Sequence, residues 1–176
     1  MLLLGSLFFI GFQLNRGAAF AINFLAVQAL EDPYIPLPDI IHVYTPKINV
    51  MVPDFFLAIS SLYMLICYNY WYEVEQNLWT LAICIILRSF SVFFTIMPTC
   101  MPEPTNTVKS AYENLFLSTH DLMFSGHSLF FICISNITQT SIIKYIGPFL
   151  LVMARQHYTI DVIGSGLVYY YVFNNI

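Results

Sequence analysis

Apolar residues occur in six runs along the chain, and the charged and proline residues collect between them. A helix that crosses a bilayer needs about 20 mostly apolar residues. A charge in the middle of a bilayer is costly, so charged residues mark the connections between such helices. The pattern therefore predicts six membrane helices, at residues 2–30, 53–70, 78–97, 122–137, 142–153 and 157–173.

The stretches between the runs are typical of connections. Residues 31–52 contain four prolines, which exclude a continuous helix there. The sequence WYEVEQN at 71–77 predicts an acidic connection with interfacial aromatic residues. Residues 98–120, with three prolines and several charges, predict a long polar loop on the membrane face where residues 31–52 also lie.

The first run, at 2–30, is longer than a straight span requires. This length predicts either a tilted helix or a polar bundle interior that Asn15 and Arg16 face. The run lacks a basic start and resumes after Arg16, so we expect a retained helix rather than a cleaved signal peptide.

Composition supports the membrane interpretation. Apolar residues make up 59% of the 176 positions and charged residues 9%, against about 25% charged in ordinary globular domains. We therefore expect one all-α domain, 1–176, built as an integral, multi-pass bundle of six transmembrane helices. A net charge of −4 with six Lys plus Arg excludes a nucleic-acid surface, which needs a basic face. The four cysteines have no metal-ligand spacing, so neither a metal nor another cofactor is expected.

Some ionisable residues lie inside or at the start of an apolar run, where they are candidates for function. Six crossings put the end of the third run and the starts of the fourth and sixth on one membrane face. The same face then carries the loops at 31–52 and 98–120, with Arg88 deeper in the bundle. This alternation of crossings, here called parity, brings five ionisable residues to the face: Asp121, His127, Arg155, His157 and Asp161.

His157 and Asp161 are four residues apart, which places them on one face of a helix. A carboxylate beside one imidazole nitrogen fixes the tautomer and leaves the other nitrogen as nucleophile or base. A surface ion pair is the alternative interpretation, and the surrounding apolar run argues against it.

The second histidine follows Ser125 and Gly126 in the sequence SGHS. Glycine lets a ligand approach the backbone closely, and His127 is a candidate acid for a leaving oxygen. Arg88 and Arg155 are candidates for phosphate binding, because a guanidinium binds phosphate through two parallel hydrogen bonds. Interfacial snorkelling explains Arg155 equally well.

Four blocks in order resemble a known family. DLMFSGHS and ARQHYTIDV resemble the catalytic blocks of the sphingomyelin synthase and ceramide phosphoethanolamine synthase family, within the type 2 phosphatidic acid phosphatase superfamily. LRSFSVFFTIMP resembles its third-span block, and PLPD its block after the first span. The resemblance implies a catalytic set of His127, His157 and Asp161. Asp121 stands where the family has an acidic residue, and Arg88 and Arg155 match arginines in its blocks.

The resemblance implies a phosphotransferase that moves a phosphocholine or phosphoethanolamine headgroup from a glycerophospholipid donor to ceramide. The implied location is the Golgi, endoplasmic reticulum or plasma membrane of a eukaryotic cell. Choline and ethanolamine both remain open as headgroups, as does the orientation in the membrane. A lipid phosphatase or phospholipase C-type hydrolase uses the same residues with water as acceptor, but its usual KxxxxxxRP block is absent. A channel, transporter or sensor is the third alternative.

Overall fold

The computed structural model describes residues 2–29, 36–67, 71–95 and 124–176. These residues form helices and no strand, which confirms the all-α prediction for the described chain. The helices are α1 (Leu2–Ala29), α2 (Ile40–Tyr44), α3 (Met51–Cys67), α4 (Trp71–Phe94), α6 (Gly126–Ile137), α7 (Ile143–Met153) and α8 (Thr159–Phe173).

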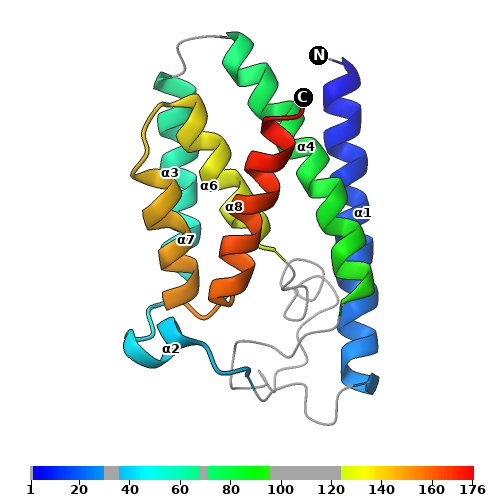
Figure 1. The fold of residues 1–176 in the computed structure, drawn as a ribbon, viewed down its shortest axis with the longest axis vertical. Coiled ribbons are helices and arrows are strands. Elements are labelled where there is room, and N and C mark those ends of the chain that lie inside the picture. Colours follow the sequence, from blue (N-terminus) through cyan, green and yellow to red (C-terminus); the bar gives the residue numbers. More distant parts are fainter. Residues whose placement is uncertain (1, 30–35, 68–70, 96–123) are drawn as a thin grey trace.

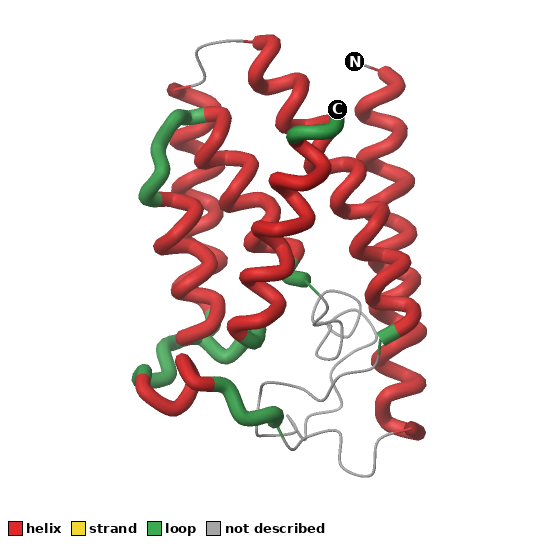
Figure 2. The backbone as a smooth tube through the Cα atoms, viewed as in Figure 1, coloured by secondary structure: helices red, strands yellow, loops and turns green. Residues whose placement is uncertain are grey.

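The long helices lie side by side and alternate in direction, with both chain ends at one end of the bundle (Figure 1). The short α2 lies across the opposite end, and there α1, α4 and α7 end while α3 and α8 begin (Figure 2). The start of α6 points to the same end but lies further inside the bundle than the start of α8. The parity argument from sequence therefore matches the arrangement of the described helices.

The core lies between α4, α6 and α8, and α1 packs along the outer side of α4. Tyr169 of α8 is fully buried, and its hydroxyl donates to Asn77 Oδ1 of α4 at 2.7 Å. The Asn77 amide also donates to the carbonyl of Glu73 at 2.7 Å. A polar side chain in this core thus has partners on its own helix and on the neighbouring one, as burial requires.

The acidic connection expected at 71–77 is wrong, because these residues form the first two turns of α4. The segment contains no proline or glycine to end a helix. Glu73 lies in the first turn, where the helix dipole favours a negative charge. The acidic residues therefore start a helix here instead of separating two helices.

Other boundaries differ by a few residues. The helix α3 begins at Met51, two residues before Pro53, since proline is tolerated in a first turn. The helix α8 begins at Thr159, so His157 precedes it. Residues 98–120 and Asp121 lie outside the described residues.

The exterior of the bundle is strongly apolar. Phe55, Phe94 and Leu167 expose 68%, 81% and 70% of their surface, on α3, α4 and α8. In the described part of the chain, the stretch Glu73–Phe94 is helical, long and apolar enough to cross a membrane. The apolar helices α3, α6, α7 and α8 are shorter than 18 residues. The 12 residues of α6 rise about 18 Å, less than the roughly 30 Å of a hydrocarbon core.

The close approach of α6 and α7 depends on Gly147. A Cβ atom added there would overlap the ring of Phe131, which is fully buried and packs against Phe56 of α3. Pro148 follows within the same helix and also lies buried. A residue without a side chain is therefore needed at this crossing.

Gly147→Ala should destabilise the fold, because the buried Phe131 ring cannot move away from the new methyl group. We expect the free energy of unfolding to fall by about 1–3 kcal/mol, measured by thermal or denaturant unfolding of the purified protein. Gly166→Ala is the control, since a Cβ at Gly166 meets no atom within 4 Å. Equal stability of the two variants would contradict this packing argument.

Candidate active site at the α2 end of the bundle

The pair predicted from sequence is present and buried. His157 Nδ1 lies 3.7 Å from Asp161 Oδ2, and the two side chains are 8% and 1% exposed. This distance is an ion-pair contact and exceeds hydrogen-bond length. Among the described residues, Nδ1 has no hydrogen-bond partner.

The pair is built by the start of α8 rather than by a helix face. Tyr158 is the N-cap residue, and its backbone N–H donates to Asp161 Oδ2 at 3.0 Å. Asp161 thus satisfies one of the donors that a helix start leaves without a partner. The expectation that His157 lies inside a helix is wrong, yet the capping turn brings the same two side chains together.

Ser125 joins the start of α6 to α8. Its side chain caps α6 by accepting from the Ser128 N–H at 3.2 Å. Its own N–H donates to the Asp161 carbonyl at 3.2 Å, and its carbonyl accepts from the Ser165 hydroxyl at 3.0 Å. The two sequence blocks that carry the histidines are therefore connected by direct hydrogen bonds.

His127 lies in the first turn of α6, and its ring contacts a carboxylate that sequence reasoning did not single out. His127 Nε2 is 3.7 Å from Asp54 Oδ1, and both side chains are 47% exposed. Asp54 lies in the first turn of α3. Its signal in the sequence was a lone acidic residue near the start of a predicted membrane helix, on the face that parity assigns to the histidines.

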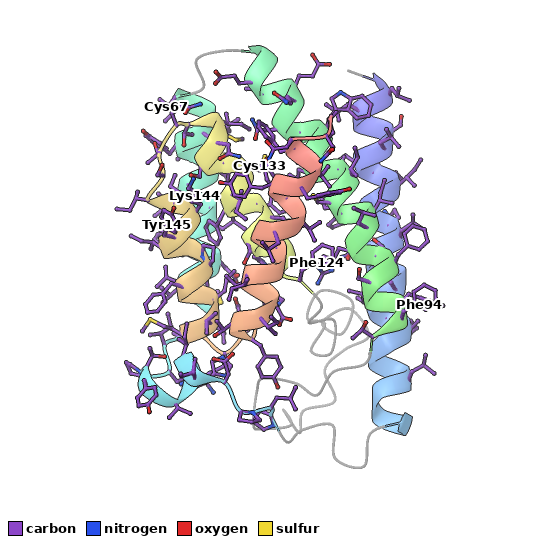
Figure 3. The ribbon with its side chains drawn as sticks, in the orientation of Figure 1. Cys67, Phe94, Phe124, Cys133, Lys144 and Tyr145 are labelled. Atoms are coloured by element: carbon purple, nitrogen blue, oxygen red, sulfur yellow. The ribbon has the colours of Figure 1, made fainter. Side chains whose placement is uncertain are left out.

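Arg88 is 5% exposed and lies against the start of α6. Its Nε donates to the Phe124 carbonyl at 3.0 Å, and its Nη1 donates to Asn15 of α1. Figure 3 labels Phe124 where the chain enters α6. A Cβ at Gly126 would lie 3.5 Å from Arg88 Nε, so the glycine backbone and the guanidinium are close neighbours. Asn15 therefore faces α4, which fits one of the two interpretations of the long first run.

Arg155 faces the segment before α3. It donates to the carbonyls of His42 and Thr45, the latter at 2.9 Å, and to Thr45 Oγ1 at 3.5 Å. Its φ of 61° lies in the left-handed region, as does the φ of 24° at Phe124. Each such non-glycine residue costs on the order of 1 kcal/mol. Phe124 and Arg155 lie two to three residues before His127 and His157, and a third left-handed residue, Gln139, lies in the turn between α6 and α7. The described contacts of Arg155 are structural.

Residues 36–50, here called the strap, cover the turn between α7 and α8 (Figure 1). Asp39 caps α2 and also accepts from Thr159 N at 2.7 Å and from Thr159 Oγ1 at 2.8 Å. The His42 ring donates to the His157 carbonyl at 3.2 Å. The Leu37 N–H donates to the Tyr158 hydroxyl at 2.8 Å. Leu37 and Asp39 of the PLPD block thus bind Tyr158 and Thr159, the two residues that follow His157.

Two titratable groups of the strap have shifted pKa values. Burial raises the pKa of Asp39, but the hydrogen bonds from Thr159 and His42 outweigh it and leave the pKa below its ordinary value. Burial lowers the pKa of His42, with help from the Arg155 guanidinium and partial opposition from Asp39. The strap therefore favours an ionised Asp39 and a neutral His42.

The α2 end of the bundle brings several chemically reactive side chains together. The described residues contain no group of three or more His, Cys, Asp or Glu side chains that could hold a metal ion. They do contain one buried histidine with a carboxylate, a second histidine on a connected helix start, and a buried arginine beside it. Such a set can supply a nucleophile, a proton donor and positive charge.

No protein-family model matches this chain, and no curated protein matches it. The family resemblance therefore depends on the four sequence blocks, and function has to be argued from the site.

Asp39→Asn should loosen the strap, because a neutral amide binds the Thr159 and His42 donors more weakly. We expect the unfolding midpoint at pH 7 to fall by about 2–4 °C relative to the unchanged protein. A lowered carboxyl pKa stabilises the fold above the unfolded pKa, and this stability is lost as the pH falls through the folded pKa. The difference between the two proteins should therefore shrink below about pH 4.

Glu75→Gln, near the other end of α4, is the charge-matched control and should leave the midpoint almost unchanged. A difference between Asp39→Asn and the unchanged protein that does not shrink at all as the pH falls below about 4 would mean that the charge of Asp39 does not stabilise the strap.

Proposed function

We propose that the protein is an integral membrane phosphotransferase. It moves a phosphocholine or phosphoethanolamine headgroup from a glycerophospholipid to ceramide and releases diacylglycerol. The observation that carries the proposal is the buried His157–Asp161 pair, connected through Ser125 to the helix start that bears His127. The resemblance to the sphingomyelin synthase family supplies the names of the substrates.

The exterior of the bundle supports a membrane location. Large apolar side chains are exposed on α1, α3, α4, α7 and α8, where water would be an unfavourable neighbour. The long helices alternate in direction (Figure 1), and polar side chains such as Arg88, Asn77 and Ser165 are buried between them. Both features support a multi-pass protein of six spans. Both proposed substrates are lipids, so a site at one end of such a bundle meets them at the headgroup level.

In the first step, His157 attacks the phosphorus of the donor lipid. Asp161 faces Nδ1, which assigns Nε2 as the nucleophile. The new Nε2–P bond forms as the bond from phosphorus to the diacylglycerol oxygen breaks, and that oxygen keeps the electron pair. His127 gives it a proton. Diacylglycerol leaves, and the headgroup phosphate remains on His157.

In the second step, the primary hydroxyl of ceramide gives its proton to His127 and attacks the phosphorus. The N–P bond breaks, its electron pair returns to Nε2, and His157 and His127 recover their starting states. No metal or redox partner enters the balance. The headgroup phosphate is transferred first to His157 and then to ceramide, and the phosphohistidine is the intermediate between these two transfers.

Positive charge at the site supports phosphoryl transfer, which depends mainly on positioning and electrostatics. Arg88 is buried beside Gly126, so its charge acts at short range on a phosphoryl group at the start of α6. Ser125 and Gly126 hold this helix start in place. Arg155 holds the strap over the His157 turn, which makes it a positioning residue in this proposal.

The proposal predicts headgroup transfer in a defined system. Purified protein in liposomes with ceramide and labelled phosphatidylcholine or phosphatidylethanolamine should convert at least one donor to a labelled ceramide product and diacylglycerol. His157→Ala should abolish the product, whereas Lys144→Ala, near the other end of the bundle, should retain it. Labelled free headgroup phosphate in place of a ceramide product would indicate the hydrolase. No headgroup release from any donor would favour a channel, transporter or sensor.

Asp161→Asn tests the role of the Asp161 charge beside His157. Asp161 Oδ2 both accepts from the Tyr158 N–H and faces His157 Nδ1. An amide oxygen in this position keeps the Tyr158 hydrogen bond, so the fold should persist, but it no longer carries the negative charge that orients and stabilises the His157 ring. We expect turnover to fall by about 100-fold or more at matched expression, with little change in the unfolding midpoint. Turnover close to that of the unchanged protein would remove Asp161 from the mechanism.

A further inference from the structure

Asp54 and His127 form a second carboxylate–imidazole contact in the same end of the bundle. The 3.7 Å separation joins the first turn of α3 to the first turn of α6, helices that are far apart in the sequence. Nothing in the sequence blocks pointed to Asp54. Its position next to the proposed proton donor raises the question of what the carboxylate does there.

The immediate surroundings of His127 disfavour a positive charge. With Ser125 as N-cap, His127 is the second residue of α6, where the backbone N–H groups and the helix dipole present positive charge. The buried Arg88 guanidinium lies beside Gly126, the preceding residue. Both are unfavourable electrostatic neighbours for an imidazolium ion.

The proposed reaction needs the protonated ring at its first step. His127 must hold a proton that it gives to the departing diacylglycerol oxygen, and a general acid works best when its pKa is near the working pH. A carboxylate within about 4–6 Å favours the charged form of an imidazole. Asp54 lies within that range, and its effect on the charge of the ring does not depend on which ring nitrogen exchanges the proton.

We propose that Asp54 is the positioning residue for His127, orienting the ring and keeping it protonated against the helix start and Arg88. The role in proton transfer rests on the proposed function, whereas the effect on the ring itself does not. The charged groups that face the start of α6 in the described chain are Asp54 from α3, Arg88 from α4 and, through the Ser125 hydrogen bond, Asp161 from α8. The Asp161 carboxylate is turned to the Tyr158 N–H and His157, so among the described residues Asp54 is the carboxylate in contact with His127.

The first arm of the test measures the ring directly. The full chain, labelled with ¹⁵N-histidine in detergent micelles or nanodiscs, is titrated by NMR, and the His127 signal is assigned by its loss in His127→Ala. In Asp54→Asn the pKa of His127 should fall by about half a unit, the size expected for a partly exposed pair. Asp54→Glu should restore most of the shift, and Glu75→Gln should leave the His127 pKa unchanged.

The second arm measures transfer in the liposome assay as a function of pH. Loss of a general acid limits the rate on the alkaline side, so Asp54→Asn should move the alkaline limb of the profile to lower pH by the same amount. At pH 7 we expect a severalfold slower reaction. A merely structural role for Asp54 would lower the rate at every pH without moving the limb. Should Asp54→Asn fail to fold, Asp54→Ser gives the same two measurements.

The two arms separate the inference from the function. An unchanged His127 pKa in Asp54→Asn overturns the role of Asp54, whatever the activity. A lowered His127 pKa in a protein that transfers no headgroup retains the pairing and overturns the phosphotransferase. A lowered pKa together with the shifted limb supports both.

Discussion

The geometry of the candidate site depends on the hydrogen bonds that Asp161 accepts. Its carboxylate binds the Tyr158 N–H and faces the His157 ring, while its carbonyl accepts from the Ser125 N–H and the Ser165 hydroxyl. The first pair of contacts shapes the turn before α8, and the second fixes the start of α6. A polar residue that is 2% exposed can stay buried only with such partners. The same satisfaction of polar groups therefore determines where both histidines lie.

The described exterior is rich in large exposed apolar side chains, and several polar side chains are buried inside. Arg88, Asn77 and Ser165 are buried with partners, while phenylalanine and leucine side chains are exposed on the outer faces of the helices. In a hydrocarbon environment, exposed apolar side chains carry no free-energy penalty. Polar side chains that point inward can form hydrogen bonds with other protein groups, which lipid chains cannot provide. Among the described residues, the buried charged side chains of Arg88 and Asp161 have such partners and lie toward the α2 end of the bundle.

Helix positions and the sharing of one end by the two histidine blocks could be predicted from sequence, because apolar length and crossing parity depend on the chain alone. The pairing of His157 with Asp161 followed from a spacing of four residues. The contact between Asp54 and His127 could not be predicted, since it depends on how α3 packs against α6. The role of Arg155 was also hidden, because a left-handed φ at that residue directs its side chain to the strap. Residues 71–77 were misassigned because acidic residues start helices as readily as they separate them.

The strap gives the site a dependence on synthesis order. Asp39 lies between the first two long helices, yet its partner Thr159 is 120 residues later in the chain. During translation, the earlier helices can form and pack well before Thr159 leaves the ribosome. A nascent chain that stops before α8 would hold His127 and Arg88 without the turn that carries His157. For the proposed phosphotransferase, the catalytic set would therefore be complete only after the segment through α8 has been made.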